Sequence, residues 1–302
     1  LQKRPNNFEI KKHGIYIIDR FYLEKYLLKD AKKNNVSTFI GRRMIDYNHP
    51  NEIILDNNEK INGKIIIDAT GISCQIGKKI GINTSIKPKD IGVCIQSRVE
   101  GKFDQYNMKM WYHKPFAPFG YAWTFPKSEK VANIGVGIPG GQNKDLQSLL
   151  KKYISYEAGE NYKILHTFRS CVPASEPLDN LSKNNVLFVG DAARLANPVF
   201  ENGINNSIFS GSVAGIVAAK YIKGDISNLK IYDKAMGKKV KRMKKTYRNK
   251  NKLNTEEKYI KSYRRVFSTL NILNKLFPNL LQNQLIKVVK KDKKIIDSFK
   301  HN

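Results

Sequence analysis

Hydrophobic positions near the start of the chain recur three or four residues apart. Between residues 21 and 36 this spacing predicts an amphipathic helix that ends at Asn34–Asn35. Short apolar runs follow and predict β-strands, with DNNEKING as a turn-rich hairpin connection between the last two. The four runs are STFI (37–40), RRMIDY (42–47), EIIL (52–55) and KIIIDATG (64–71).

A longer block of alternating residues predicts successive antiparallel strands at 91–99, 108–113, 121–126 and 130–138. A short helix (147–156) and another strand (164–172) come next. The run NNVLFVG (184–190) has the uninterrupted apolar character of a buried strand, and it precedes a long helix from Gly203 to Tyr221. Strands interleaved with helices, then an antiparallel block, then helices indicate a mixed α/β architecture.

The region after Tyr221 has a different composition and is predicted to form helices with basic faces. One helix over 258–277 carries a single apolar stripe and ends before Pro278, and a last helix follows over 280–299. The apolar stripe consists of Tyr259, Tyr263, Val266, Phe267, Leu270, Leu273 and Phe277.

Charge is unevenly distributed along the 302 residues, whose formal net charge is +28. Positions 220–302 hold 24 Lys/Arg against 6 Asp/Glu, a net of +18, and positions 1–219 hold 30 against 20, a net of +10. Such a basic region favours an anionic membrane, a phosphorylated substrate or nucleic acid, unless it is only a solvated Lys-rich face. No nucleic-acid-binding fold is recognisable, so we expect no nucleic-acid partner.

Metal and disulfide chemistry receive no support from the sequence. Three widely spaced cysteines fit neither a disulfide framework nor a CxxC pair, which indicates reduced thiols in the cytoplasm. The five histidines lack metal-ligand spacing. No run of about 18 apolar residues predicts a transmembrane helix.

The segment VLFVGDAAR carries the clearest chemical signal. Its apolar strand runs into Gly190, which permits a tight turn, and Asp191 then stands at the carboxyl end of the strand, where α/β folds bind ligands. The helix that begins at Gly203 presents unpaired N–H groups and a partial positive charge, which favour an electron-rich oxygen. The alternative is a plain strand–turn–helix packing unit.

The stretch GDAARLANPVFENGINNSIFSG resembles the second FAD-binding motif of flavoproteins of the glutathione-reductase type. Arg after GDAA and Asn before Pro are similar to the geranylgeranyl reductase family, in particular its archaeal digeranylgeranylglycerophospholipid reductases. Four further stretches agree in order, so the resemblance covers about residues 15–220. They are DRFYLEKYLLKDA (19–31), IIIDATG (65–71), FGYAWTFPKSEKVANIGVGI (119–138) and FRSCVPASEPLDNLSKNNVLFVGDAA (168–193).

The resemblance implies a cofactor, FAD, and a role for several residues toward it. Asp191 would bond the ribityl chain, and Gly203 and Ile204 would place backbone N–H groups at the flavin pyrimidine end. It also implies contacts with FAD at three other positions, for which ordinary structural roles stay open. These are Arg20 (or a surface salt bridge), Met44 near the adenine (or core packing) and Gly71 (or a turn glycine).

The resemblance also implies a fold and its division. We expect a Rossmann-like FAD-binding domain of the glutathione-reductase/p-hydroxybenzoate-hydroxylase type over 1–85 and 160–222, an antiparallel substrate sheet over 86–159 and a basic helical region over 223–302. Such flavoproteins begin with a βαβ unit carrying a GxGxxG turn, and that pattern does not occur in this sequence. We therefore expect an N-terminally truncated fragment, which would bind FAD poorly or not at all.

The substrate implied by the resemblance is a geranylgeranyl chain of an archaeal ether phospholipid, whose C=C bonds the enzyme would saturate. Tyr121, Trp123 and Phe125 alternate along one strand, so they share a face that would line a tunnel for a polyprenyl chain, or would be ordinary sheet aromatics. No catalytic side chain is assigned, and ferredoxin, a nicotinamide and a deazaflavin all remain open as electron donor. A lipid substrate implies a cytoplasmic protein peripheral on the inner face of the membrane.

Two other functions remain open at this point. One is a flavin monooxygenase or dehydrogenase acting on another apolar substrate, although such monooxygenases often carry His where this chain has Arg194. The other is a flavin-less remnant that binds lipid or membrane. Glu201-Asn202 stand where reductases of this family usually have glycines, and a glutamate beside the flavin would disfavour an anionic reduced flavin unless its side chain points elsewhere.

Overall fold

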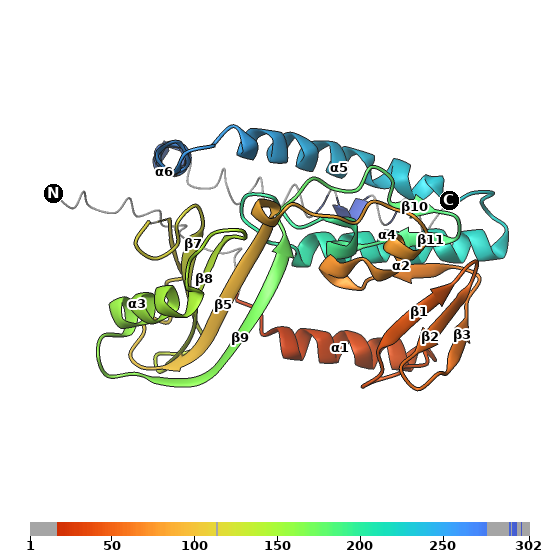
Figure 1. The fold of residues 1–302 in the computed structure, drawn as a ribbon, viewed down its shortest axis with the longest axis horizontal. Coiled ribbons are helices and arrows are strands. Elements are labelled where there is room, and N and C mark those ends of the chain that lie inside the picture. Colours follow the sequence, from red (N-terminus) through yellow and green to blue (C-terminus); the bar gives the residue numbers. More distant parts are fainter. Residues whose placement is uncertain (1–16, 113, 277–289, 291, 295–296, 298–302) are drawn as a thin grey trace.

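A short parallel pair of strands joins two segments that are far apart in the sequence. The computed structural model (Figure 1) describes residues 17–276 except 113, together with 290, 292–294 and 297. Strand β4 (Ile66–Asp68) runs parallel to β11 (Val186–Phe188), and β10 (Ser182–Lys183) pairs antiparallel with β11. Because parallel strands end at the same edge, the segments that follow Asp68 and Phe188 meet there.

A separate small sheet precedes the parallel pair and corrects two predictions. Its order is β1 (Met44–Asn48), β2 (Glu52–Leu55) and β3 (Lys60–Asn62). The strand predicted over 37–40 is wrong, because that segment is irregular. The stretch DNNEKING is more than a turn, since part of it forms β3 and pairs with β2. Both errors arise because short polar strands and short apolar loops carry little periodicity.

The four predicted antiparallel strands form one sheet, and a fifth strand from beyond the expected boundary joins them. The strand order is β6-β7-β8-β5-β9. Strand β9 pairs with β5 along its length, so the sheet extends past residue 159. The strands are β5 (Ile91–Glu100), β6 (Lys109–Trp111), β7 (Tyr121–Pro126), β8 (Val131–Pro139) and β9 (Lys163–Pro173).

Helix α3 (Leu146–Ala158) covers one face of this sheet. The Asp145 carboxylate caps its first turn by accepting from the Gln147 and Ser148 N–H groups. Its buried residues Leu150 and Tyr153 pack against the sheet in a compact apolar cluster. The sheet residues of this cluster include Ile95, Ala122, Ile134 and Val136. Side chains that alternate with these point to the opposite face of the sheet, which α3 leaves uncovered.

Helix α4 (Ile204–Lys223) follows β11 and supplies the core of the parallel part. Its residues Phe209, Val213 and Val217 are buried with Leu187 and Phe188. The connections between these elements are short helical turns. They are η1 (Gly71–Ser73), α2 (Gln75–Lys79), η2 (Pro88–Asp90) and η3 (Gly190–Ala193).

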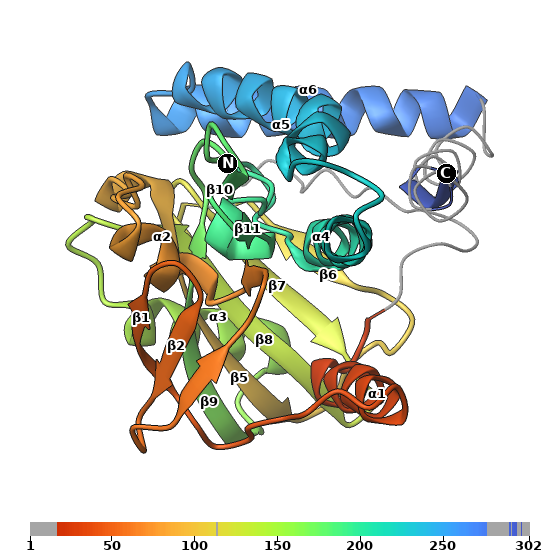
Figure 2. The ribbon, with the colours of Figure 1, turned by 90° about the vertical axis from the view of Figure 1, so that its right-hand side faces the viewer.

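The basic helices α5 (Lys230–Asn251) and α6 (Glu256–Leu276) lie along one side of the molecule (Figures 1 and 2). Helix α5 lies over α4 and the β10–β11 hairpin in both views, whereas α6 lies above β7 in Figure 1. Helix α5 buries Tyr232, Met236 and Met243. Tyr259 and Tyr263 of the predicted α6 stripe are buried, whereas Val266 is exposed. Pro278 and most of the last predicted helix lie outside the described residues. No helix in the described part of the chain is long and apolar enough to span a bilayer.

Helix α1 (Arg20–Lys33) confirms the first predicted helix. Asp19 caps it through the Phe21 N–H. Its apolar side chains are not buried: Phe21, Tyr22 and Tyr26 are each about two-thirds exposed. The amphipathic spacing therefore predicts the helix correctly. In the described part of the chain, however, the apolar face of this helix is not buried against another element.

Candidate active site

The turn after β11 is built by close contact between backbone and helix. Gly190 has a positive φ of 53°, and its N–H donates to the Ser210 hydroxyl of α4 at 3.0 Å. A Cβ on Gly190 would come within 2.7 Å of Ser207 Oγ, so glycine is needed both for the backbone angle and for the close approach. This contact holds η3, which contains Asp191, against the first turns of α4.

Asp191 presents a partly buried carboxylate beside the start of α4. A Cβ on Gly203, the residue that precedes α4, would lie 3.2 Å from Asp191 Oδ1. Within the described residues, none donates a hydrogen bond to this carboxylate. Burial raises the pKa of Asp191, and the charge of Arg20 opposes that shift. The acceptor oxygens are thus available to a ligand that carries hydroxyl groups.

The N-terminus of α4 is likewise without a side-chain cap, because Gly203 occupies the N-cap position. The preceding loop is ordered by Asn197, whose side-chain oxygen accepts from the Val199 and Phe200 N–H groups at 2.9 and 3.0 Å. The first N–H groups of a helix carry a partial positive charge, so this end can stabilise an anion or an electron-rich carbonyl.

The other residues predicted for FAD have diverse surroundings. Gly71 has a φ of 72° and open space around a hypothetical Cβ, and its turn η1 lies next to η3. Arg20 is exposed and forms an ion pair with Glu24 at 2.6 Å, yet its charge reaches Asp191. Met44 is partly buried and packs against the core of the parallel part. Gly71, Arg20 and Asp191 therefore surround one region, while Met44 has an evident packing role.

Tyr121, Trp123 and Phe125 share the face of the sheet opposite α3, as their alternation predicts. Neighbouring ring centroids lie 5.6 and 6.2 Å apart. Gly135 on β8 pairs with Trp123, and a Cβ there would overlap the indole ring. The indole crosses β8 above this glycine and donates to Gln96 Oε1 at 2.8 Å.

The aromatic face contacts the loop that leads into α4. The Tyr121 hydroxyl donates to the Phe200 carbonyl at 2.8 Å. Two α6 tyrosines, Tyr259 and Tyr263, close the same side. Tyr263 stacks on Tyr112 with centroids 3.9 Å apart and donates to the Val199 carbonyl at 3.3 Å. The sequence predicts this α6 stripe but gives no means of placing it over the sheet, because the sheet comes much earlier in the chain.

Glu201 points at the large sheet. A Cβ on Gly92 would overlap its carboxyl group, and a Cβ on Gly137 would lie 3.8 Å from its Oε2 atom. Cys94 Sγ is 4.0 Å from Oε2. The Glu201 carboxyl therefore lies against β5 and β8.

These features fit a flavin. An acceptor carboxylate, an uncapped helix N-terminus and a glycine with open space lie around one region. Asp191 would hold ribityl hydroxyls, and the N–H groups at Gly203 and Ile204 would face the electron-rich pyrimidine end.

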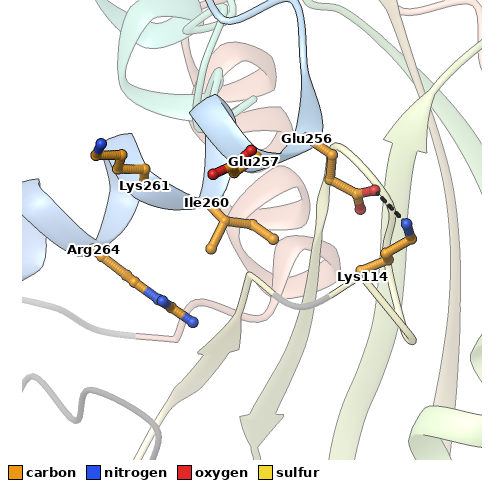
Figure 3. A pocket seen from close by; sticks show the side chains of 6 residues that line it. All are labelled: Lys114, Glu256, Glu257, Ile260, Lys261 and Arg264. Atoms are coloured by element: carbon orange, nitrogen blue, oxygen red, sulfur yellow. Dashed lines mark ion pairs between the residues drawn. The ribbon is translucent and has the colours of Figure 1, made fainter. Parts of the chain in front are cut away.

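A groove lies elsewhere on the molecule (Figure 3). A groove of about 570 Å³ between α6 and Lys114 is lined mainly by charged side chains, and Lys114 forms an ion pair with Glu256 at 3.4 Å. Its lining includes none of the residues predicted for FAD or substrate. The lining residues are Lys114, Glu256, Glu257, Ile260, Lys261 and Arg264.

The fold resembles those of solved flavoenzyme structures. It is similar to a geranylgeranyl bacteriochlorophyll reductase-like protein from Thermoplasma acidophilum, with a TM-score of 0.65, 23% identity, and 87% of this chain and 69% of that chain covered. It is also similar to the flavin-dependent brominase Bmp2, with a TM-score of 0.57, 15% identity, and 92% and 69% covered. The predicted Rossmann-type flavoenzyme fold, with its antiparallel sheet and C-terminal helices, is confirmed.

Sequence relatives then narrow the class. Residues 90–172 match the model of the geranylgeranyl reductase catalytic domain. Digeranylgeranylglycerophospholipid reductase 1 of Methanococcoides burtonii is 31% identical over 72% of this chain and 56% of its own length. The enzyme of that name from Methanothrix thermoacetophila is 30% identical over 75% and 62%. The chain belongs to the geranylgeranyl reductase family, as the resemblance predicts, and spans 56–62% of the length of these two relatives.

Proposed function

We propose that this chain belongs to an FAD-dependent reductase that saturates C=C bonds of geranylgeranyl chains in archaeal isoprenoid ether phospholipids. The observation that carries the proposal is the contact between two halves of one site. The aromatic face with Tyr121 lies directly against the loop that leads into the uncapped end of α4. The names of the relatives, which are digeranylgeranylglycerophospholipid reductases, support the same substrate.

The chain's own residues would bind and orient the reactants. Asp191 and the α4 N-terminus would hold the flavin, which supplies a hydride when it is bound and reduced. The face of Tyr121, Trp123 and Phe125 would bind the hydrocarbon and exclude water. Burial of apolar surface is favourable by about 25 cal/mol of free energy per Å² removed from water. Binding of such a substrate needs few polar side chains.

The test uses the full-length protein purified with its flavin. After anaerobic reduction with dithionite, a digeranylgeranyl ether lipid is added and weighed by mass spectrometry. We expect mass gains of two hydrogens for each saturated bond, whereas a lipid with saturated chains should gain none. A yellow protein that leaves the unsaturated lipid unchanged would refute the reductase activity. A colourless protein would refute the proposal that the enzyme binds FAD.

Membrane association is the second part of the proposal, and the charge of α5 supports it. The buried side chains Tyr232, Met236 and Met243 occupy one face of this helix. Exposed cations recur along the opposite face at helical spacing, and we call them the α5 stripe. Each contributes about 1 kcal/mol near an anionic surface. The α5 stripe consists of Lys234, Lys238, Lys241, Lys245, Arg248 and Lys252.

Vesicle sedimentation tests this association. The full-length protein should sediment with vesicles containing anionic phospholipid and not with neutral vesicles. Changing Lys241 and Lys245 of the α5 stripe to Gln should weaken binding about tenfold or more, whereas the same change at the exposed Lys102 and Lys151 should have little effect. Equal loss in both pairs would indicate net charge alone, and binding to neutral vesicles would contradict the electrostatic explanation.

A further inference from the structure

Glu201 occupies a place on the sheet that Gly92 keeps free. Gly92 lies on β5, and a Cβ on it would overlap Glu201 Oε2, so the carboxyl could not stay where it is beside any other side chain. On the neighbouring strand β8, a Cβ on Gly137 would be in ordinary contact with the same oxygen. The sheet therefore leaves room for this carboxyl group, although the glutamate comes from a loop that is distant in sequence from both strands.

The carboxyl lies on the same face as the aromatic residues. Tyr121, Gly137 and Cys94 are paired in one row across β7, β8 and β5. A Cβ on Gly137 would lie 3.0 Å from Cys94 Sγ and 3.4 Å from the Trp123 ring, in addition to its approach to Glu201. A hydrocarbon chain bound on this face would therefore run past the Glu201 carboxyl.

The backbone conformation of Glu201 is one that glycine adopts more easily than glutamate. Its φ is 55°, in the left-handed region where a side chain costs about 1 kcal/mol or more and glycine costs nothing. The Glu201 N–H donates to the Asn197 carbonyl at 2.8 Å, which fixes this conformation. Strained residues of this kind concentrate at functional sites.

Burial, and not a neighbouring charge, favours the protonated form of Glu201. Burial raises the pKa of Glu201 to about 7, and the Lys250 ammonium on α5 opposes the shift. Within the described residues, no cation forms an ion pair with Glu201. The other titratable groups that face it are neutral near pH 7. They are the Cys94 thiol on β5, Tyr112 and Tyr121 beside and on β7, and Tyr259 and Tyr263 on α6.

Saturation of an isolated alkene needs a proton as well as a hydride, because no carbonyl group is present to hold negative charge. On the basis of the proposed function, we propose that Glu201 donates this proton to the substrate alkene. The O–H bond of the carboxyl breaks, a C–H bond forms at one alkene carbon, and the other carbon receives the hydride with its electron pair from the reduced flavin. The carboxylate then regains a proton from solvent.

The test compares Glu201→Gln with Glu100→Gln, a change at an exposed glutamate on the same strand as Gly92. Each full-length protein is loaded with flavin, reduced anaerobically and mixed with the digeranylgeranyl lipid, and flavin reoxidation and lipid mass are followed. Glu201→Gln should slow reoxidation by about 10²- to 10⁴-fold, the usual contribution of a positioned acid, with lipid affinity unchanged. Glu100→Gln should behave as wild type.

A readout without substrate accompanies the kinetics. The infrared band of the protonated carboxyl should titrate near neutral pH in the flavin-free wild-type protein and be absent from Glu201→Gln. Gly92→Ala provides a second variant, because its Cβ would displace the carboxyl without removing it; it should slow the reaction and alter this band. If Glu201→Gln fails to fold, the rate and the infrared band of Gly92→Ala test the role of the Glu201 carboxyl instead.

Failure of the inference and failure of the proposed function give different results. A wild-type protein that binds flavin and leaves the lipid unchanged would refute both. A wild-type protein that reduces the lipid, with Glu201→Gln equally fast, would refute only the role of Glu201. Loss of lipid affinity with an unchanged rate constant for the bound lipid would show that Glu201 only shapes the pocket, which would also overturn the proposal.

Discussion

Replacing Glu201 by glutamine should change how the stability of the protein depends on pH. Below pH 4.5 the carboxyl is protonated in both the folded and the unfolded chain and has no effect. Between pH 4.5 and about 7 the folded protein keeps a proton that the unfolded chain releases, so its stability falls as pH rises. Since each pKa unit corresponds to about 1.36 kcal/mol, the loss reaches about 3 kcal/mol above pH 7.

The amide introduced by Glu201→Gln does not titrate, so this loss should disappear in the variant. Urea denaturation at a series of pH values between about 5 and 8 measures the free energy of unfolding of both proteins. As the pH rises across this range, the free energy of unfolding of the variant should increase relative to that of wild type by about 2–3 kcal/mol. The same measurement on Glu100→Gln should give a pH profile parallel to that of wild type.

Parallel profiles for Glu201→Gln and wild type would refute the reasoning. They would mean that Glu201 keeps its ordinary pKa in the folded protein, and hence that its carboxyl is hydrated and not held against Gly92. A difference of the opposite sign would mean that a cation stabilises the charged carboxylate. Lys250 is the candidate for that role, because its charge already acts on Glu201 from α5.

Three further predictions concern other sites. Asp191→Asn should weaken flavin binding about tenfold or more, as measured by fluorescence titration, because hydrogen bonds to a charged acceptor contribute about 1.5–3 kcal/mol, while the flavin-free variant should lose no stability above neutral pH. Tyr232→Phe should destabilise the fold by about 1–3 kcal/mol in urea denaturation, because the buried Tyr232 hydroxyl donates to the Phe188 carbonyl at 2.9 Å. Gly237→Ala should raise stability by about 0.5–1 kcal/mol, because nothing lies within 4 Å of the added Cβ at this exposed position of α5; a loss of stability would contradict the open space found there.

The sequence predicts most of the elements because their periodicity is strong and local. Helix α1 begins at its Asp19 cap, and the strands of the large sheet lie where alternation places them. Sequence order does not predict strand order, however. Strand β5 lies between β8 and β9, a position set by long-range pairing that no local pattern encodes. Similarly, β3 and the segment 37–40 are too short for a reliable period.

The site, like the fold, has local features that the sequence predicts and long-range contacts that it does not. Asp191 and Gly203 come together because one loop links them, and Tyr121 and Trp123 share a face because they alternate along one strand. Both relations follow from the local backbone. The meeting of Glu201 with Gly92 depends instead on how segments that are distant in sequence pack together. A departure from the family's glycines marks Glu201 as unusual, but gives no direction for its side chain.

Glu201 reduces the stability of the fold in two ways, and the glycine that its carboxyl contacts adds a further cost. The left-handed backbone costs about 1 kcal/mol or more, and burial of the charged carboxylate costs about 3 kcal/mol more above neutral pH. A glycine at this position would avoid both costs. Gly92 adds to them, because glycine in a strand weakens it. Two unfavourable choices, one from a loop and one from a strand, therefore converge on one carboxyl group on the aromatic face. Stability does not explain their convergence, whereas the role that we propose for Glu201 as a proton donor is consistent with it.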